Sequence, residues 1–191
     1  HAANYQLASS TTTTTADITA RALTVSASGA NKVYDGTTSA TITLADNRIS
    51  GDSLNTSYTS ASFATKFAGT NKTISVSGIS VTGTDAANYT FNSTVTATAN
   101  ITARSLSVTA TGSNKVYDGS TSATVTLADN RLSGDSLSTT YTTASFANKN
   151  VGTAKTVSVS GISISGADAA NYSANTTASA SADITARALT L

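Results

Sequence analysis

The sequence predicts an all-β protein that consists of two tandem, small β-sandwich-like domains arranged end to end as an elongated rod. The first observation behind this prediction is a repeat: Ile-Thr-Ala-Arg begins at residues 18, 101 and 184, and about 57 of 83 positions match between the two copies without insertion or deletion. The second is the alternation of apolar and polar residues in many short segments, which is typical of half-buried strands. The third is that no Gly/Ser-rich or Pro-rich linker separates the copies.

The composition favours strands over helices. About a third of the residues are Ser or Thr, and Thr favours strands whereas Ser favours turns. Each repeat has few large aliphatic side chains, so its core must be thin and backbone hydrogen bonds must carry much of its stability. No stretch has convincing helical periodicity. The net charge of only +1, together with the strong alternation, argues against a disordered chain.

The strands expected in the first repeat are separated by clear turn signals. Asp35-Gly36 is a strong one, because glycine accepts a positive φ angle and aspartate can cap its own turn. The alternation changes parity at Ser77-Gly78, which predicts a bulge or a sharp bend. The expected strands are residues 23–27, 40–44, 58–64, 74–81 and 89–103.

Residues 89–103 carry the longest alternation in the chain, and an unbroken strand of that length would span roughly 50 Å. Phe91 falls on the same face as the aliphatic residues of this segment, which buries it if that face forms the core. Its counterpart in the second copy is Ala174. Because loss of a buried Phe costs a few kcal/mol, the second repeat is expected to unfold first.

The repeat divides the chain into four segments. We expect the terminal strand of a preceding repeat in 1–21, repeat 1 in 22–104, repeat 2 in 105–187 and the start of a following repeat in 188–191. The alternation restarts at Arg104-Ser105, so the inter-repeat junction is assigned to a strand crossover. Its residues are Ile101, Arg104 and Leu106.

The sequence offers little to catalysis, and no catalytic residue is assigned. The only His is residue 1, and Cys and Glu are absent, so a Ser-His-Asp arrangement is impossible within either repeat. Asp-Asp pairs such as Asp46 with Asp52, and Asp129 with Asp135, remain, but turn-capping explains them better. A hydrolase is therefore not expected.

No cofactor or metal site is assigned either. Calcium stays an open alternative at the same Asp-Asn clusters, and at Asp17 and Asp183 beside the repeat boundaries, but no loop has the regular Asp spacing of known calcium loops. Lys–Asn isopeptide cross-links that use Lys32 or Lys72 also remain open. Asn-x-Ser/Thr triplets are abundant, but so much Ser and Thr produces them by chance.

Tyr-Asp-Gly is the most distinctive motif of the repeats. A ligand-stacking Tyr is one interpretation, and the favoured one is a Tyr that packs over the core while Asp-Gly makes the turn. The motif occupies Tyr34, Asp35 and Gly36 in the first copy, and Tyr117, Asp118 and Gly119 in the second.

Together with Leu-Ala-Asp-Asn-Arg, Asp-Ala-Ala-Asn-Tyr and Ile-Thr-Ala-Arg-x-Leu, this motif resembles the YDG-type repeats of large bacterial surface adhesins, which are filamentous-haemagglutinin-like proteins of two-partner secretion. The resemblance covers both repeats. It implies an extracellular or outer-membrane-associated setting, tandem arrays and a stalk role in adhesion or biofilm formation. It carries over no catalytic residue.

Our leading hypothesis is therefore a structural stalk whose partners are neighbouring repeats of the same adhesin. The alternative is an adhesive module that binds a glycan or another adhesin copy, a host-cell or biofilm-matrix ligand, through exposed Thr/Asn faces or through Tyr58 and Tyr141. The low charge predicts no nucleic-acid binding, and no apolar run is long enough for membrane insertion. We expect a monomer.

Overall fold

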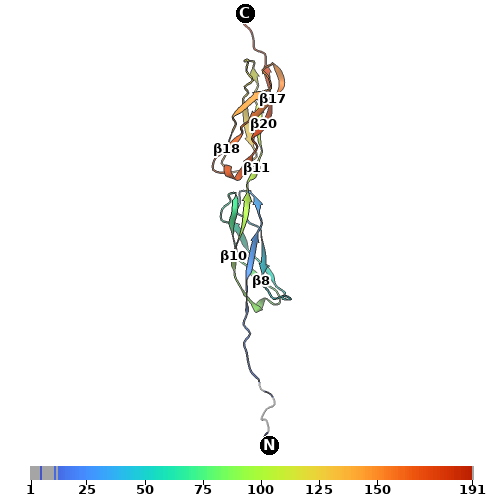
Figure 1. Cartoon of the computed structure of the whole chain (residues 1–191), viewed down its shortest axis with the longest axis vertical. Coiled ribbons are helices and arrows are strands. Elements are labelled where there is room, and N and C mark those ends of the chain that lie inside the picture. The colour runs from blue at the N-terminus through green and yellow to red at the C-terminus, as the bar shows by residue number, and fades with distance from the viewer. Residues whose placement is uncertain (1–4, 6–10, 12, 191) are drawn as a thin grey trace.

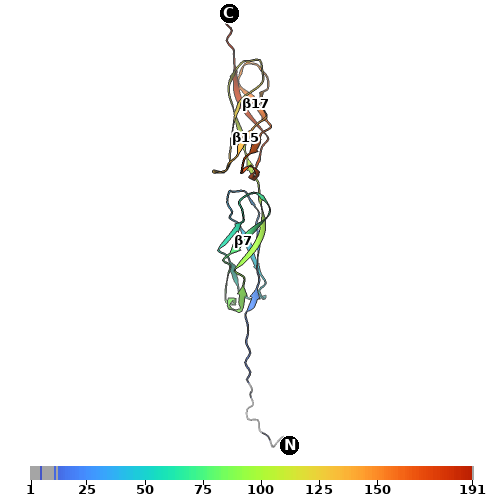
Figure 2. The same ribbon diagram turned by 90° about the vertical axis from the view of Figure 1, so that its left-hand side faces the viewer.

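A computed structural model describes residues 5, 11 and 13–190, and it is all-β with two tandem domains. The domains lie end to end along the long axis of the molecule (Figure 1 and Figure 2). Much of the terminal strand expected in 1–21, and Leu191, lie outside the described residues. None of the described helices is long and apolar enough to cross a membrane.

The two repeats contain the same succession of elements. Repeat 1 has β1 (Arg21–Leu23), β2 (Val25–Gly29), β3 (Lys32–Val33), β4 (Ile42–Asp46), β5 (Asn55–Ser57), β6 (Ser60–Phe63), β7 (Gly69–Ser77), β8 (Ser80–Thr82), the 3₁₀ helix η2 (Ala86–Asn88), β9 (Tyr89–Phe91) and β10 (Thr94–Thr102). Repeat 2 has β11 (Arg104–Leu106), β12 (Val108–Gly112), β13 (Lys115–Val116), β14 (Val125–Asp129), β15 (Ser138–Thr140), β16 (Thr143–Phe146), β17 (Gly152–Ser160), β18 (Ser163–Ser165), η3 (Ala169–Asn171), β19 (Tyr172–Ala174) and β20 (Thr177–Thr185).

A four-stranded sheet forms one side of each domain, in the order β3-β10-β7-β6 and β13-β20-β17-β16. The short first strand of this sheet runs parallel to its long neighbour, and the other pairs are antiparallel. Three two-stranded pairs complete repeat 1: β2 with β4, β5 with β8 and β1 with β9. Repeat 2 reproduces these pairings.

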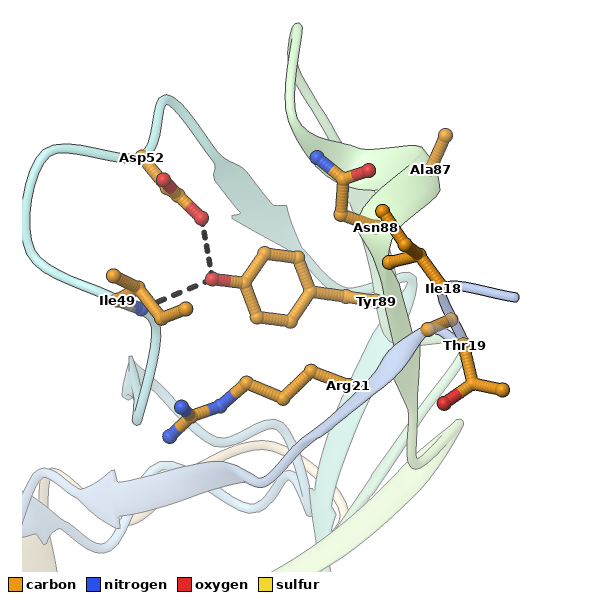
Figure 3. A pocket seen from close by; sticks show the side chains of 9 residues that line it. Ile18, Thr19, Arg21, Ile49, Asp52, Ala87, Asn88 and Tyr89 are labelled. Carbon is orange, nitrogen blue, oxygen red and sulfur yellow. Dashed lines mark hydrogen bonds between the residues drawn. The ribbon is translucent and has the colours of Figure 1, made fainter. Parts of the chain in front are cut away.

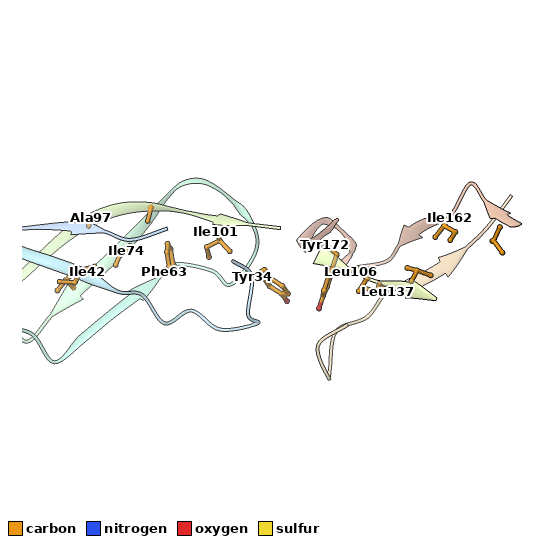
Figure 4. Close-up of a cluster of buried hydrophobic side chains, with 14 of the residues drawn as sticks. Tyr34, Ile42, Phe63, Ile74, Ala97, Ile101, Leu106, Leu137, Ile162 and Tyr172 are labelled. Carbon is orange, nitrogen blue, oxygen red and sulfur yellow. The ribbon is translucent and has the colours of Figure 1, made fainter. Parts of the chain in front are cut away.

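The core is thin because small residues line the contact between β2 and β10. Ala97 and Ala99 on β10 are buried beside Ile74 of β7. A Cβ added to Gly29 of β2 would lie only 2.6 Å from Ile74 Cδ1 and 2.8 Å from the carbonyl oxygen of Thr98, so the two layers approach too closely for any side chain there. Figure 4 shows how the buried side chains follow one another along both domains.

The long strand expected over residues 89–103 is wrong in its continuity, because Asn92 interrupts it. The chain forms β9 and β10 with a break between them. Asn92 Oδ1 accepts a hydrogen bond from Val25 N–H at 2.9 Å, and Asn92 Nδ2 donates to the carbonyl oxygen of Val25 at 3.0 Å. The Asn92 side chain thus bonds the backbone of Val25 in place of a neighbouring strand. As a result, β9 and β10 belong to different sheets.

The expected burial of Phe91 is also wrong. This side chain is 40 % exposed, because the break at Asn92 turns it away from the core that β10 lines. The argument that repeat 2 loses a few kcal/mol through Ala174 therefore fails. Val157 of repeat 2 still replaces Ile74 of repeat 1, and both side chains are completely buried. The change from a buried isoleucine to valine lowers the free energy of unfolding by about 0.5–1.5 kcal/mol.

Two smaller expectations concern local breaks. The bend at Ser77-Gly78 is confirmed: Gly78 has φ +67° and separates β7 from β8, which pair in different sheets. The expected strand over residues 23–27 instead divides at Thr24 into β1 and β2. Thr24 N–H donates to Asn47 Oδ1 at 2.8 Å, so an asparagine side chain again replaces a strand partner.

Candidate functional site at the joint between the repeats

The two domains are joined by a single residue. β10 ends at Thr102 and β11 begins at Arg104, which leaves only Ala103 between the last strand of one domain and the first strand of the next. Ile101 is 2 % exposed in the core of repeat 1, and Leu106 is 1 % exposed in the core of repeat 2. With both ends anchored so close together, the connection has little freedom to bend.

The segment Asn31–Gly36 places Tyr34 at the end of repeat 1 that faces repeat 2. Asn31 Oδ1 accepts a hydrogen bond from Asn100 N–H at 2.7 Å, and β3 then pairs with the end of β10. Tyr34 N–H donates to the carbonyl oxygen of Thr102 at 2.8 Å. The backbone of Tyr34 is therefore fixed beside the point where the chain leaves the domain.

Lys32 and Asp35 hold the turn that follows. Lys32 Nζ donates to Asp35 Oδ1 at 2.8 Å and to the carbonyl oxygens of Thr37 and Ser39, each at 2.9 Å. Asp35 Oδ1 also accepts from Thr37 N–H at 2.9 Å, and Gly36 has φ +78°. This lysine thus braces the motif through carboxylate and carbonyl oxygens, and none of its hydrogen bonds joins the side-chain amide that an isopeptide cross-link would need.

Repeat 2 presents a pre-formed acceptor face. The loop after β14 is tied down by Arg131, whose guanidinium binds the Asp129 carboxylate and the carbonyl oxygen of Leu137. Within that loop, Leu132 N–H donates to Tyr172 Oη at 2.9 Å, and Tyr172 Oη donates to Asp135 Oδ2 at 2.6 Å. The Asp135 carboxylate is therefore positioned before any group from repeat 1 reaches it.

Tyr34 of repeat 1 meets this face directly. Its side chain is completely buried, and its hydroxyl donates to Asp135 Oδ1 at 3.1 Å. The rings of Tyr34 and Tyr172 meet edge to face, with centroids 5.6 Å apart and an interplanar angle of 76°. Figure 4 shows the two tyrosine side chains next to each other at the joint.

The loop between β6 and β7 adds the remaining contacts. Lys66 Nζ lies 3.3 Å from Asp135 Oδ1 and 3.7 Å from Asp168 Oδ1. Ala68 N–H donates to Asn171 Oδ1 at 2.9 Å, and Asn171 is only 2 % exposed. Because the Lys66 side chain is 35 % exposed, solvent screens its ion pairs and they contribute modestly.

Burial and hydrogen bonding act in opposite directions on the Asp135 carboxyl. Burial alone would raise its pKa, but hydrogen bonds from Tyr172, Tyr34 and Lys66 outweigh that effect and hold the pKa below its ordinary value. Burial raises the pKa of the Tyr34 hydroxyl, and the Asp135 carboxylate raises it further. The joint therefore pairs an ionised carboxylate with neutral tyrosines at neutral pH.

A family model described as YDG domain matches residues 19–98 and 102–180. The chain belongs to the YDG domain family. No curated protein and no solved structure matches it. The Tyr-Asp-Gly turn of the first YDG repeat, Tyr34–Gly36, lies at the joint, whereas that of the second, Tyr117–Gly119, lies beside the end of β20, at the end of repeat 2 away from the joint, with Tyr117 half-buried.

Sequence reasoning placed the joint at the crossover but missed its acceptor. Ile101 and Leu106 anchor the two cores, and Arg104 is half-buried beside them. Asp135 was considered only as half of a carboxylate pair with Asp129, and Lys66 was not singled out. The recurrence of Asp-Ala-Ala-Asn-Tyr, which supplies Asp168, Asn171 and Tyr172, was the available signal for this face.

Most of the aspartates considered for metal binding hold protein partners in the YDG repeats, whereas Asp17 is exposed and precedes the first strand. Asp46 and Asp129 each bind the arginine two residues later, and Asp52 accepts from Tyr89 Oη. Asp183 Oδ1 accepts from Ala154 N–H at 2.7 Å. Within the described part of the chain, no three His, Cys, Asp or Glu residues are grouped so as to hold a metal ion.

A second feature recurs in both YDG repeats on the flank of the rod. Tyr58 borders a shallow hollow of about 420 Å³ together with Ile42, Leu44 and Thr56. Tyr141 borders its counterpart of about 380 Å³ in repeat 2. Each hollow combines an aromatic ring with hydroxyl groups, and both open to solvent.

Proposed function

We propose that these YDG repeats are a structural spacer, a stalk segment of a secreted or surface-anchored bacterial adhesin that projects a binding tip in adhesion or biofilm formation. The observation that carries the proposal is the joint: one connecting residue and a Tyr34 side chain that is completely buried between the domains. A ligand-binding tyrosine would be exposed, whereas a stiff array needs buried contacts between neighbours. The resemblance to adhesin repeats supports the bacterial surface setting.

The hydrogen-bond pattern also suits a chain under tension. The chain enters repeat 1 through β1 and β2 and leaves through β10, and β3 runs parallel to β10 with Ile101 opposite Lys32. A force that separates the two ends therefore loads these hydrogen bonds in shear, so that several must break together. The antiparallel pairing of β7 with most of β10 adds a second row.

Small-angle X-ray scattering tests the spacer. We expect a rod-like profile with a maximum dimension near the sum of two elongated domains. The matched variant is Tyr34→Ala, which empties the centre of the joint and should broaden the distribution of inter-domain angles. A compact, folded-back particle, or a profile that Tyr34→Ala leaves unchanged, would contradict the spacer.

The recurrence of the Tyr58 and Tyr141 hollows favours one second candidate, an adhesive module that binds glycan along the rod. Aromatic rings that are partly open to solvent beside hydroxyl groups, as at Tyr58 and the half-buried Tyr141, suit the faces and edges of sugars. A glycan array probed with the chain and with the Tyr58→Ala/Tyr141→Ala double variant tests this candidate. Binding that the double variant loses would support it, and absence of binding would remove it.

A further inference from the structure

The acceptor face of repeat 2 has a counterpart at the N-terminal end of repeat 1. We define this counterpart, the free acceptor face, as Ile49, Asp52, Asn88 and Tyr89, which stand 83 residues before Leu132, Asp135, Asn171 and Tyr172. Its internal hydrogen bonds are the same. Ile49 N–H donates to Tyr89 Oη at 3.0 Å, and Tyr89 Oη donates to Asp52 Oδ2.

The free acceptor face differs from the occupied one in what covers it. Ile49 is 49 % exposed and Asn88 is exposed, whereas Asn171 at the occupied joint is 2 % exposed. Figure 3 shows Asp52, Ile49 and Tyr89 around a hollow that Arg21 and Ile18 also border. The hollow measures about 320 Å³ and lies where the Tyr34 side chain would be, by analogy with the occupied joint.

The other half of such a joint lies at the C-terminal end of repeat 2. We define this free donor face as Tyr117, Lys149 and Val151, the counterparts of Tyr34, Lys66 and Ala68. Tyr117 is half-buried, and Val151 is 53 % exposed. Tyr117 and Val151 border a mainly apolar hollow of about 500 Å³ with Arg187 and Leu189.

We propose that the free acceptor face and the free donor face are the two halves of a second joint, so that this chain docks in tandem on another copy of itself. This inference rests on the proposed spacer function and names its partner surface. Tyr117 of one copy would donate to Asp52 of the next, and Lys149 would supply the positive charge that Lys66 supplies to Asp135. The Asp52 carboxylate and the Lys149 ammonium group are opposite in charge. The ring of Tyr89 would meet Tyr117 as the ring of Tyr172 meets Tyr34.

The sequence provides the register for a direct test. Residues 184–189 repeat residues 18–23 as Ile-Thr-Ala-Arg-Ala-Leu, so residues 18–183 followed by residues 18–190 form a duplicated chain with a natural crossover. The chain has no cysteine, so spin labels can be attached at chosen cysteines. Thr126→Cys in the first copy and Thr43→Cys in the second place labels on exposed, equivalent strand positions on either side of the central joint.

Thr43→Cys with Thr126→Cys in the single chain is the matched reference, because it spans the observed joint. We expect pulsed EPR to give one narrow distance in both molecules. Tyr117→Phe in the first copy should raise the open population of the central joint about tenfold, as expected for a lost hydrogen bond to a carboxylate. In the single chain, Tyr117→Phe should leave the distance unchanged.

The outcomes separate the two proposals. Suppose that the reference distance is narrow but the distance across the central joint is broadly distributed, or does not respond to Tyr117→Phe. Either result would overturn the second joint and leave the spacer proposal standing. A broad distribution in the single chain would overturn the spacer itself. Unchanged melting of both repeats in Tyr117→Phe ensures that the variant reports on docking rather than on unfolding.

Discussion

Removal of one hydroxyl group from Tyr34 should loosen the joint without disturbing either core. In Tyr34→Phe the ring still fills its buried site and still meets Tyr172 edge to face at 5.6 Å. The hydrogen bond from Tyr34 Oη to Asp135 Oδ1 is lost, together with the interaction of that hydroxyl with Lys66. A hydrogen bond to a charged group contributes about 1.5–3 kcal/mol. Because Asp135 keeps Tyr172 and Lys66 as partners, we expect a loss of about 1.5 kcal/mol.

Tyr117→Phe is the matched control, since it makes the same chemical change in repeat 2, where Tyr117 of the isolated chain is half-buried and has no second domain against it among the described residues. It should alter the free energy of unfolding by less than about 0.5 kcal/mol. Tyr34→Ala, which removes the whole buried ring, should cost about 3–5 kcal/mol. Urea unfolding of the full chain measures all three variants.

Two results would refute this reasoning. Equal losses in Tyr34→Phe and Tyr117→Phe would mean that the hydroxyl acts within its own repeat and not across the joint. A Tyr34→Ala variant that melts like the parent but loses binding to cells would mean that the tyrosine is a ligand contact. A double-mutant cycle of Tyr34→Phe with Asp135→Asn separates the direct contact from indirect effects.

Three further predictions follow from single contacts. Burial would raise the pKa of the Asp135 carboxyl, but hydrogen bonds outweigh it and keep the folded-state pKa low. The contribution of Asp135 to the free energy of unfolding is therefore complete above about pH 4 and is lost as the pH falls through the folded-state pKa. In urea unfolding from pH 6 to 2, the free energy of unfolding should fall less in Asp135→Asn than in the parent. Asn92→Ala should cost about 1–3 kcal/mol because it leaves the backbone of Val25 without its partners, and a cost below about 0.5 kcal/mol would contradict the bridging role. Gly78→Ala should destabilise repeat 1 by more than 1 kcal/mol in thermal melts, since its φ is +67° and a Cβ would lie 2.4 Å from a threonine hydroxyl, whereas Gly69→Ala, with 3.6 Å of space, should be mild.

Features that depend on residue periodicity could be predicted from the amino-acid sequence. The 83-residue repeat, the alternating segments, the turn at Asp35-Gly36 and the bend at Gly78 all follow from residue spacing and from the φ angles that glycine accepts. The end-to-end arrangement followed from the missing linker. The alternation, the turn and the bend are set within a few neighbouring residues, and the repeat is visible when the two copies are compared, so a single sequence is sufficient to predict them.

The role of two asparagine side chains in ending strands could not be predicted from local periodicity. Asn92 and Asn47 end strands by binding the backbone of segments that are 67 and 23 residues away. Alternation continues through residue 92, so the period alone predicts one long strand with Phe91 inside. Only the folded chain shows that an amide has replaced a strand partner and that Phe91 turns outward.

The contacts across the joint, unlike its position in the chain, depend on the tertiary structure. Tyr34 and Tyr117 stand in the same motif and have the same local fold, yet one is completely buried and the other is half-buried. The difference arises from Asp135, which is 101 residues from Tyr34 along the chain. A contact between two rigid domains depends on their relative orientation, and neither residue spacing nor the turn chemistry of a single repeat contains that orientation.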